Sequence, residues 1–266
     1  MSKEYECLLY ELGGPENSVC AITMNRPEQR NAINREMAAE LLDAFCRVRD
    51  EASVKVVVFT GAGKSFCSGG DLSVLPTFNH QTVMDWLART GYDIIHNITE
   101  SEKIVVAKVK GHCLAGGLEL ALACDLIYAS EKTRFGVTEI TMGILPGWGG
   151  TARLARTMPI FRAREILLTG RKDYPARELY EMGLLTRVYA EEEFDQKVDE
   201  VVNDLAAKSA DALRMGKSVL NRSFEGINWD AAMTLERNAI MWLFYSDYAS
   251  NLRKFALAAL EQQKKS

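Results

Sequence analysis

The sequence predicts an α/β fold in which buried strands alternate with helices. Two runs rich in β-branched residues, "VKVVVFTG" (54–61) and "KIVVAKVKG" (103–111), have the composition of strands buried on both faces. Apolar residues at helical spacing occur in 35–53 and in 82–100. Strands that alternate with helices indicate crossover connections. At 266 residues, the chain is long enough for one large domain, or for a main domain with an appendage.

The N-terminal fifth is expected to form two strands and a helix. "CLLYEL" (7–12) and "VCAITM" (19–24) flank the turn signal Gly13-Gly14-Pro15. Asn34 is a candidate N-cap for the helix that follows it. The face expected to be buried in this helix consists of Met37, Leu41, Leu42, Phe45 and Val48.

The middle and the C-terminal part have different patterns. "AGKSFCSGGDLSVL" (62–75) is predicted to be a Gly/Ser-rich loop, and "GHCLAGGLELALACD" (111–125) contains an apolar helix that starts near Gly116. From about residue 195 onward the patterns are helical. The run "IMWLFYSDY" (240–248) is very apolar for a terminal helix, and exposed patches of this kind mark interfaces. We therefore expect a helical appendage that packs on a neighbouring subunit; the alternative is that it folds back on its own core.

Composition narrows the class of protein. Hydrophobic residues make up 47% and charged residues 26%, which excludes wholesale disorder. The net charge of −4 argues against a nucleic-acid binder but leaves room for a local basic patch. Six cysteines without a C-x-x-C pair indicate reduced thiols and a cytoplasmic protein. The N-terminus does not have the pattern of a signal peptide, and no apolar run reaches the length of a membrane span.

Several nucleotide and metal motifs are matched only in part. "GAGKS" (61–65) lacks the first glycine of a phosphate-binding P-loop, since Val58 stands at that position. "GWGGTA" (147–152) fits G-x-G-x-x-A, but Pro146 precedes it instead of a clear strand. The histidines, His80, His96 and His112, have no ligand spacing, so no metal site is expected.

Two glycine-rich loops follow predicted buried strands, "CSGGD" (67–71) and "LAGGLE" (114–119). Two interpretations are open and weigh evenly on this evidence. The glycines permit tight turns and close packing, or they let backbone N–H groups approach a ligand. At a helix start such donors are unpaired, and two of them converging on one oxygen would form an oxyanion hole.

Two glutamates complete the candidate chemistry. Glu119 lies one turn into the apolar helix, among leucines and alanines, so a solvated role does not suit it. Glu139 lies twenty residues further on, after the expected strand "DLIYAS" (125–130). Burial raises the pKa of a carboxyl group, which is the condition for general acid–base work near neutral pH.

At this point the sequence resembles the enoyl-CoA hydratase/isomerase (crotonase) superfamily over nearly its whole length. Any one matching block is modest evidence, but all of them in order are specific. The blocks are "MNRPEQRNAIN", "VVVFTGAGKSFCSGGDL", "KVKGHCLAGGLELALACDLIYAS", "FGVTEITMGILPGWGGTARLAR" and "ILLTGRKDYPARELYEMGLLTRV".

The resemblance implies a crotonase-like spiral of ββα units with a C-terminal helical trimerisation region. It divides the chain into a core, 1–195, that holds the CoA- and acyl-binding site and an oligomerisation region, 196–266. The expected assembly is a homotrimer, or a hexamer made of two trimers.

The resemblance also implies the substrate and its site. An acyl-CoA thioester oxygen would be held by the N–H groups of Gly70 and Gly116, with Glu119 and Glu139 as the acid–base pair of a hydratase. No cofactor is implied, because coenzyme A is part of the substrate. Residues implied to line the CoA and acyl moieties are Arg26, Ala32, Ser68, Gly69, Asp71, Leu72 and Trp148.

Three departures from the family pattern bear on substrate choice and assembly. Thr138 replaces the usual proline, Trp148 replaces a small residue and could reshape the acyl pocket, and the C-terminus lacks the usual ending. The acyl group stays open among linear, branched, aromatic and alicyclic chains, and fatty-acid β-oxidation is one natural pathway. Another crotonase-type reaction, namely isomerisation, hydrolysis or decarboxylation, is the alternative activity. A non-catalytic or RNA-binding scaffold fits less well, and no membrane partner is expected.

Overall fold

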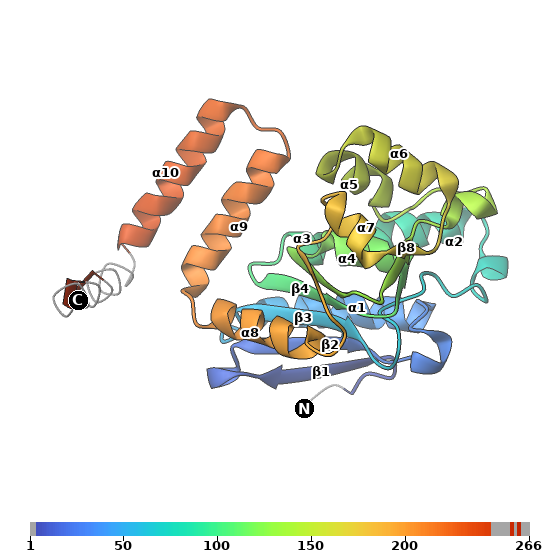
Figure 1. Cartoon of the computed structure of the whole chain (residues 1–266), viewed down its shortest axis with the longest axis horizontal. Coiled ribbons are helices and arrows are strands. Elements are labelled where there is room, and N and C mark those ends of the chain that lie inside the picture. The colour runs from blue at the N-terminus through green and yellow to red at the C-terminus, as the bar shows by residue number, and fades with distance from the viewer. Residues whose placement is uncertain (1–3, 246–255, 258–259, 262–266) are drawn as a thin grey trace. The chain divides into compact units, whose positions relative to one another are not determined.

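The computed structural model describes residues 4–245, 256–257 and 260–261, and its strands form two sheets (Figure 1). Nine strands are present in this part of the chain: β1 (Leu8–Gly13), β2 (Val19–Met24), β3 (Val56–Gly61), β4 (Ile104–Val109), β5 (His112–Leu114), β6 (Leu126–Ser130), β7 (Arg134–Gly136), β8 (Tyr174–Pro175) and β9 (Arg187–Tyr189). The large sheet has the order β1-β2-β3-β4-β6-β9, and the small sheet has the order β5-β7-β8. Neighbours in the large sheet are parallel except the β1–β2 pair.

Helices connect most of these strands, as the alternating pattern predicts. The α-helices are α1 (Arg35–Asp50), α2 (His80–Met84), α3 (Tyr92–Thr99), α4 (Gly116–Ala123), α5 (Gly150–Thr157), α6 (Ile160–Thr169), α7 (Ala176–Glu181), α8 (Phe194–Ala206), α9 (Ala210–Phe224) and α10 (Trp229–Tyr245). Short 3₁₀ helices are η1 (Pro15–Asn17), η2 (Pro27–Gln29), η3 (Leu75–Thr77) and η5 (Glu139–Met142), and η4 (Asp85–Gly91) is a π-helix. The predicted α/β class is confirmed.

Helix α1 packs on one face of the large sheet. The Asn34 side chain accepts the Met37 N–H at 2.9 Å, which confirms the predicted N-cap. Of the predicted apolar face, Leu42 alone is only half-buried. The Phe45 ring meets the ring of Phe59 in β3 edge to face, with centroids 5.4 Å apart. Burying a side chain of this size stabilises the fold by about 1.5–3 kcal/mol.

Strand β3 is less enclosed than its composition predicts. Val57 and Phe59 are buried on the side of α1, whereas Val58 and Thr60 are half-buried. Alternate residues of a strand face opposite sides of the sheet, so Val58 and Thr60 face α8. Because α8 leaves a hollow over this face, the strand is fully buried on one side only.

The apolar segment 111–125 divides into a strand and a helix. His112–Leu114 pairs in parallel with β7, an element that the sequence did not reveal. Helix α4 then starts at Gly116, as expected. The change of direction falls at Ala115, whose φ of 48° and ψ of −126° are unusual for a residue with a side chain.

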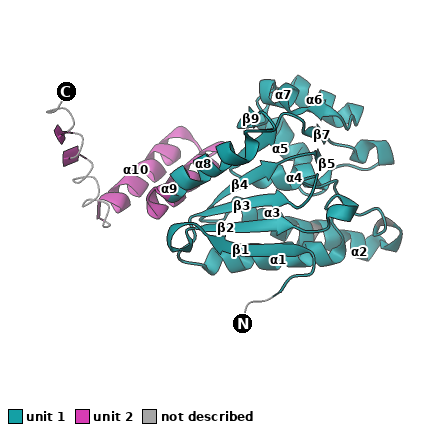
Figure 2. Cartoon of the chain, turned by 60° about the horizontal axis from the view of Figure 1, so that its bottom comes forward, with its two compact units in different colours: residues 1–206 teal, residues 207–266 magenta. Residues whose placement is uncertain are grey.

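The chain divides into two compact units, residues 1–206 and 207–266 (Figure 2). Helix α8 packs against β3, β6 and β9 and belongs to the first unit. In the second unit, α9 packs against α10, and the Arg214 guanidinium lies 5.2 Å from the centre of the Trp242 ring. The last expected helix, 250–266, lies mostly outside the described residues.

The cysteines and the helix lengths bear on two further expectations. All six cysteines are free, and four of them are buried. Within the described part of the chain, no helix is both long enough and apolar enough to cross a bilayer.

Candidate active site

The structure brings the two glycine-rich loops together. The Cys67 N–H donates to the His112 carbonyl oxygen at 3.0 Å, and the Leu114 N–H donates to the Cys67 carbonyl oxygen at the same distance. Helix α4 approaches this loop very closely, since a Cβ on Gly117 would lie 2.5 Å from the Cys67 oxygen. Any side chain at this position would push the helix off the loop, so Gly117 is required for close packing.

The amide groups of Gly70 and Gly116 border one small space. A Cβ built on Gly116 would lie 3.8 Å from the Gly70 nitrogen. The bridge between Ile33 and Gly70 uses the Gly69 carbonyl and the Asp71 N–H, which leaves the Gly70 N–H out of it. Neither the Gly70 nor the Gly116 N–H donates to another described residue. Two unengaged donors this close can hold an oxygen that gains negative charge.

Backbone strain at Ala115 lies directly beside these donors. A left-handed φ on a residue with a Cβ costs about 1–3 kcal/mol, and such strain gathers at functional sites. The Ala115 N–H is held by the Gly136 carbonyl oxygen at 2.9 Å, so the small sheet fixes the strained residue. The result is a helix whose first amide, that of Gly116, lies at the edge of the glycine loop.

Glu119 is buried in α4, with 5% of its surface exposed. Its Oε1 atom accepts two backbone hydrogen bonds, from the Trp148 N–H at 2.7 Å and the Gly150 N–H at 2.8 Å. The pKa of Glu119 is raised to about 7: burial is the main cause, the charge of Glu139 adds to it, and the backbone donors oppose both effects. The carboxyl group therefore titrates near neutral pH, in the range that suits a general base.

Glu139 is the first residue of η5 and is buried to a similar degree. Burial is the main cause that raises its pKa. Its Oε2 atom is buried and has no hydrogen-bond partner among the described residues. Because a buried polar atom without a partner is costly, this oxygen is suited to a ligand or a water molecule. The charge of Glu139 also raises the pKa of Glu119, so the two carboxyl groups are electrostatically coupled.

Sequence reasoning missed the two amides that hold Glu119. They belong to "GWGGTA", which partly matches a dinucleotide motif and does not follow a strand. A Cβ on Gly150 would lie 3.0 Å from Glu119 Oε1 and from its Cγ, so a small residue is needed there. The available signal was the run of glycines that begins at Gly147, twenty-eight residues after Glu119. Nothing in the sequence indicated that these glycines contact the glutamate.

The residues predicted to line the CoA moiety form one cluster around an ion pair. Arg26 Nη1 lies 3.0 Å from Asp71 Oδ2, and the same atom donates to the Ala32 carbonyl oxygen. Hydrogen bonding from Ser73 is the main cause that lowers the pKa of Asp71. The Arg26 charge is thus largely engaged by Asp71 within the chain.

The rest of the predicted cluster lies on the adjoining loop. Gly69 accepts the Ile33 N–H at 2.8 Å, and the Ser68 hydroxyl lies 3.5 Å from the Gln29 carbonyl oxygen. Leu72 is 66% exposed. The loops 26–33 and 68–72 therefore lie side by side, and the second of them presents the apolar Leu72 side chain to solvent.

The Trp148 side chain is almost fully buried and packs against η4. Its ring centroid is 5.3 Å from that of Trp86, which in turn is 5.8 Å from that of Phe78. The indole therefore belongs to an aromatic cluster, while the backbone N–H of the same residue binds the Glu119 carboxylate.

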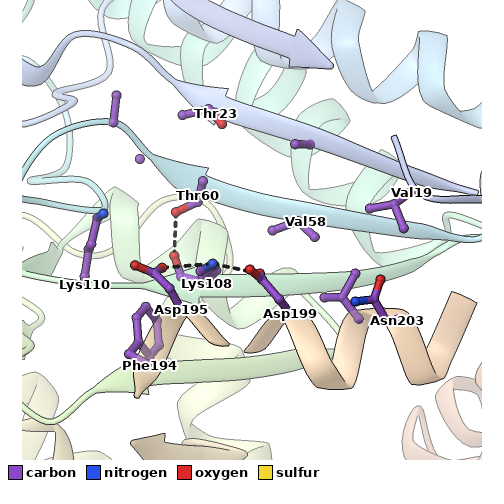
Figure 3. A pocket seen from close by; sticks show the side chains of 15 residues that line it. Val19, Thr23, Val58, Thr60, Lys108, Lys110, Phe194, Asp195, Asp199 and Asn203 are labelled. Atoms are coloured by element: carbon purple, nitrogen blue, oxygen red, sulfur yellow. Dashed lines mark hydrogen bonds and ion pairs between the residues drawn. The ribbon is translucent and has the colours of Figure 1, made fainter. Parts of the chain in front are cut away.

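A hollow lies on the open face of the large sheet, beside α8 (Figure 3). Its volume is about 560 Å³, and its walls include Val58, Thr60 and Phe194. Lys108 Nζ is bound there by Asp195 and Asp199, each at 2.9 Å. No predicted site residue lines this hollow, so it is separate from the two glutamates. Among the described residues, no three His, Cys, Asp or Glu side chains gather as metal ligands would.

Comparison with known proteins identifies the family. Residues 14–264 match the enoyl-CoA hydratase/isomerase family, and the chain belongs to it. A mitochondrial enoyl-CoA hydratase from Pongo abelii is 32% identical over 98% of this chain and 87% of that protein. A crotonyl-CoA hydratase from Syntrophomonas wolfei is 31% identical, with 98% of this chain and 97% of that protein covered.

A solved structure supports the same assignment. The enoyl-CoA hydratase from Bacillus anthracis superposes with a TM-score of 0.89 at 29% identity and covers 95% of this chain and 97% of that one. The crotonase-like fold predicted from the sequence is therefore confirmed.

Proposed function

We propose that this protein is an enoyl-CoA hydratase, a hydro-lyase that adds water across the 2,3-double bond of an enoyl-CoA thioester. The observation that carries the proposal is the pairing of two buried carboxyl groups with two unengaged backbone donors. Two relatives named as hydratases, which are 32% and 31% identical to this chain, support it.

In the proposed reaction the thioester oxygen accepts the N–H groups of Gly70 and Gly116. As the oxygen of water bonds to C3, electron density moves through C2 to the thioester oxygen, where the two donors stabilise it. Glu119 takes the proton from the attacking water. Glu139 delivers its own proton to C2 when the carbonyl re-forms. Proton exchange with solvent then returns both carboxyl groups to their starting states.

The environments of the two glutamates suit these opposite roles. Backbone donors on Oε1 favour the charged form of Glu119, as a base requires. Glu139 Oε2 has no donor; burial is the largest influence on the pKa of Glu139 and favours the protonated form that a proton donor requires, and backbone hydrogen bonds from Glu139 itself and from Thr138 oppose this effect in part. Each such general acid or base contributes roughly 10²- to 10⁴-fold to a rate.

The CoA moiety is proposed to lie along the loops 26–33 and 68–72. Leu72 offers an exposed apolar contact there, and the Arg26–Asp71 pair fixes the shape of the loops. No cofactor beyond the CoA of the substrate is proposed. A role in β-oxidation and a cytoplasmic location stay predictions.

We also propose that the protein is a homo-oligomer, a trimer or a hexamer. Helices α9 and α10 expose many large apolar side chains, which a solvated monomer rarely does. They include Leu220, Phe224, Trp229, Met241, Phe244 and Tyr245. Light scattering coupled to size-exclusion chromatography would test this, and a monomer at micromolar concentration would refute it.

A turnover screen tests the activity itself. The purified protein would be offered linear, branched, aromatic and alicyclic enoyl-CoA thioesters, and loss of the conjugated chromophore would be followed. Turnover of at least one conjugated thioester to its 3-hydroxyacyl product is expected. Shift of the double bond, thioester hydrolysis or decarboxylation without hydration would assign one of the alternative reactions instead.

A further inference from the structure

The π-helix η4 is fitted against the backbone that holds Glu119. A π-helix closes by i→i+5 hydrogen bonds and is rare outside functional sites. Trp86 and Gly91 are five residues apart, and in an α-helix at 100° per residue they would point about 140° apart. Here one indole, that of Trp148, contacts both. The π-turn therefore places the two residues on one face.

The contact with Gly91 leaves no space for a side chain. A Cβ on Gly91 would lie 2.0 Å from Trp148 Nε1 and 2.1 Å from its Cδ1. Both partners are buried, and the ring is a rigid group that also packs on Trp86. A methyl group at position 91 would therefore displace the indole as a whole.

Gly147, the residue before Trp148, also packs against η4 without space for a side chain. A Cβ on Gly147 would lie 2.3 Å from Leu87 Cδ2, so η4 contacts two consecutive residues of this loop. Arg153 Nη1 adds a bond to the Trp148 carbonyl oxygen at 3.4 Å. The backbone around Trp148 is thus held from two sides.

The same backbone carries the donors to the carboxylate. The N–H groups of Trp148 and Gly150 both bind Glu119 Oε1, and they flank the loop residue Gly149. We propose that Gly91 is a positioning residue for Glu119. Because Gly91 has no side chain, the Trp148 indole packs directly against it, and this packing keeps the N–H groups of Trp148 and Gly150 in hydrogen-bonding position on the carboxylate. This inference rests on the proposed function, in which Glu119 is the base, and extends it to η4.

The test measures the pKa of Glu119 directly, by carbon NMR of protein labelled at the glutamate carboxyl groups, with Glu119→Gln to assign the signal. The charged groups facing Glu119 are Glu139 from η5 and Arg153 from α5, and neither is changed. Gly91→Ala should raise the pKa of Glu119 by about one unit, because displaced amides no longer stabilise the carboxylate.

A double-mutant cycle separates positioning from general damage. In a Trp148→Ala background the collision is absent, so adding Gly91→Ala should leave the pKa of Glu119 unchanged. The matched control is Gly13→Ala, where a Cβ would have no neighbour within 4 Å. An unchanged pKa in Gly91→Ala alone, or an equal rise in both backgrounds, overturns the proposal.

If Gly91→Ala does not fold, Trp148→Ala alone carries the test through amide hydrogen exchange. Loss of the seated indole should speed exchange at position 148 and at Gly150 roughly tenfold or more, since hydrogen bonds to charged groups are strong. Protection equal to that of the unchanged protein at both amides would overturn the proposal. Neither readout needs catalysis, so absence of hydration would count against the proposed function and leave the positioning result intact.

Discussion

The two glutamates lie in regions that restrain them very differently. Glu119 is part of a regular helix, and its Oε1 atom is bound by two amides from a distant loop. Glu139 opens a short 3₁₀ helix, and its Oε2 atom has no partner among the described residues. Both are buried, yet one carboxyl group is held in place and the other keeps an acceptor free.

The difference bears on how two buried carboxyl groups can take the roles of base and acid. Two carboxyl groups in the same apolar surroundings would compete for one proton. Backbone donors oppose the rise in pKa at both groups, and the ionised form of Glu139 raises the pKa of Glu119, so the two groups titrate as a coupled pair. The proposed assignment of Glu119 as base and Glu139 as acid therefore depends on geometry: two amides fix the Glu119 carboxylate, whereas the Oε2 atom of Glu139 has no partner among the described residues.

The largest expected effect comes from Glu119→Gln. The glutamine side chain has nearly the same volume as glutamate, and its amide oxygen can still accept the hydrogen bonds from the Trp148 and Gly150 N–H groups. It cannot take a proton from water. We expect kcat for hydration to fall by about 10⁴-fold, while binding of the substrate thioester changes little. Stopped-flow turnover and calorimetric binding would measure the two quantities. Glu11→Gln, an exposed glutamate on β1, is the matched control, and near-normal turnover in Glu119→Gln would refute the role of base.

Glu139→Gln should lower kcat by about 10³-fold, because no proton reaches C2. It also removes a titratable neighbour whose ionised form raises the pKa of Glu119, so that pKa should fall below about 7. Carbon NMR of the Glu119 carboxyl group would detect the fall. An unchanged pKa of Glu119 in this variant would show that the two carboxyl groups are not coupled, which would contradict the account of the pair.

The oxyanion donors can be tested with Gly116→Pro. Gly116 is the first residue of α4, where proline is tolerated because its missing N–H has no helical partner. Loss of one such donor should cost roughly 10²- to 10³-fold in kcat. Ala210→Pro makes the same change at the start of α9 and should leave kcat intact. Equal activity of the two variants would argue against an oxyanion hole at Gly116.

The smallest predicted effect concerns stability. The native pKa of Glu119, about 7, is raised above its ordinary value of 4.5. Between these values the native state binds more protons than the unfolded state, so the free energy of unfolding falls as the pH rises. Above the native pKa the loss is on the order of 3 kcal/mol. Glu119→Gln should therefore be more stable than the unchanged protein at about pH 8, and less markedly so at about pH 5. Denaturant unfolding would measure this, and a destabilised variant at the higher pH would contradict it.

The sequence was sufficient to predict the strands β1, β2, β3, β4 and β6, the cap at Asn34 and the start of α4. It also singled out Glu119 and Glu139 as candidates, and both are buried in the structure. These depend on periodicity, on local capping and on family spacing. It was not sufficient to predict how loop residues meet across the fold. The bond from the Gly150 N–H to Glu119, and the fit of Trp148 over Gly91, join segments that are far apart in the chain. Glycine runs show that something approaches closely, but they do not say what.

Hydration in isotopically labelled water tests the central claim most directly. An enoyl-CoA thioester would be converted in ¹⁸O-water and, separately, in D₂O, with the unchanged protein and with Glu119→Gln. The account predicts ¹⁸O at C3 and deuterium at C2 of a 3-hydroxyacyl-CoA product, with formation nearly abolished in the variant. Product formed at the same rate by both proteins, or a product that carries no oxygen label at C3, would contradict it.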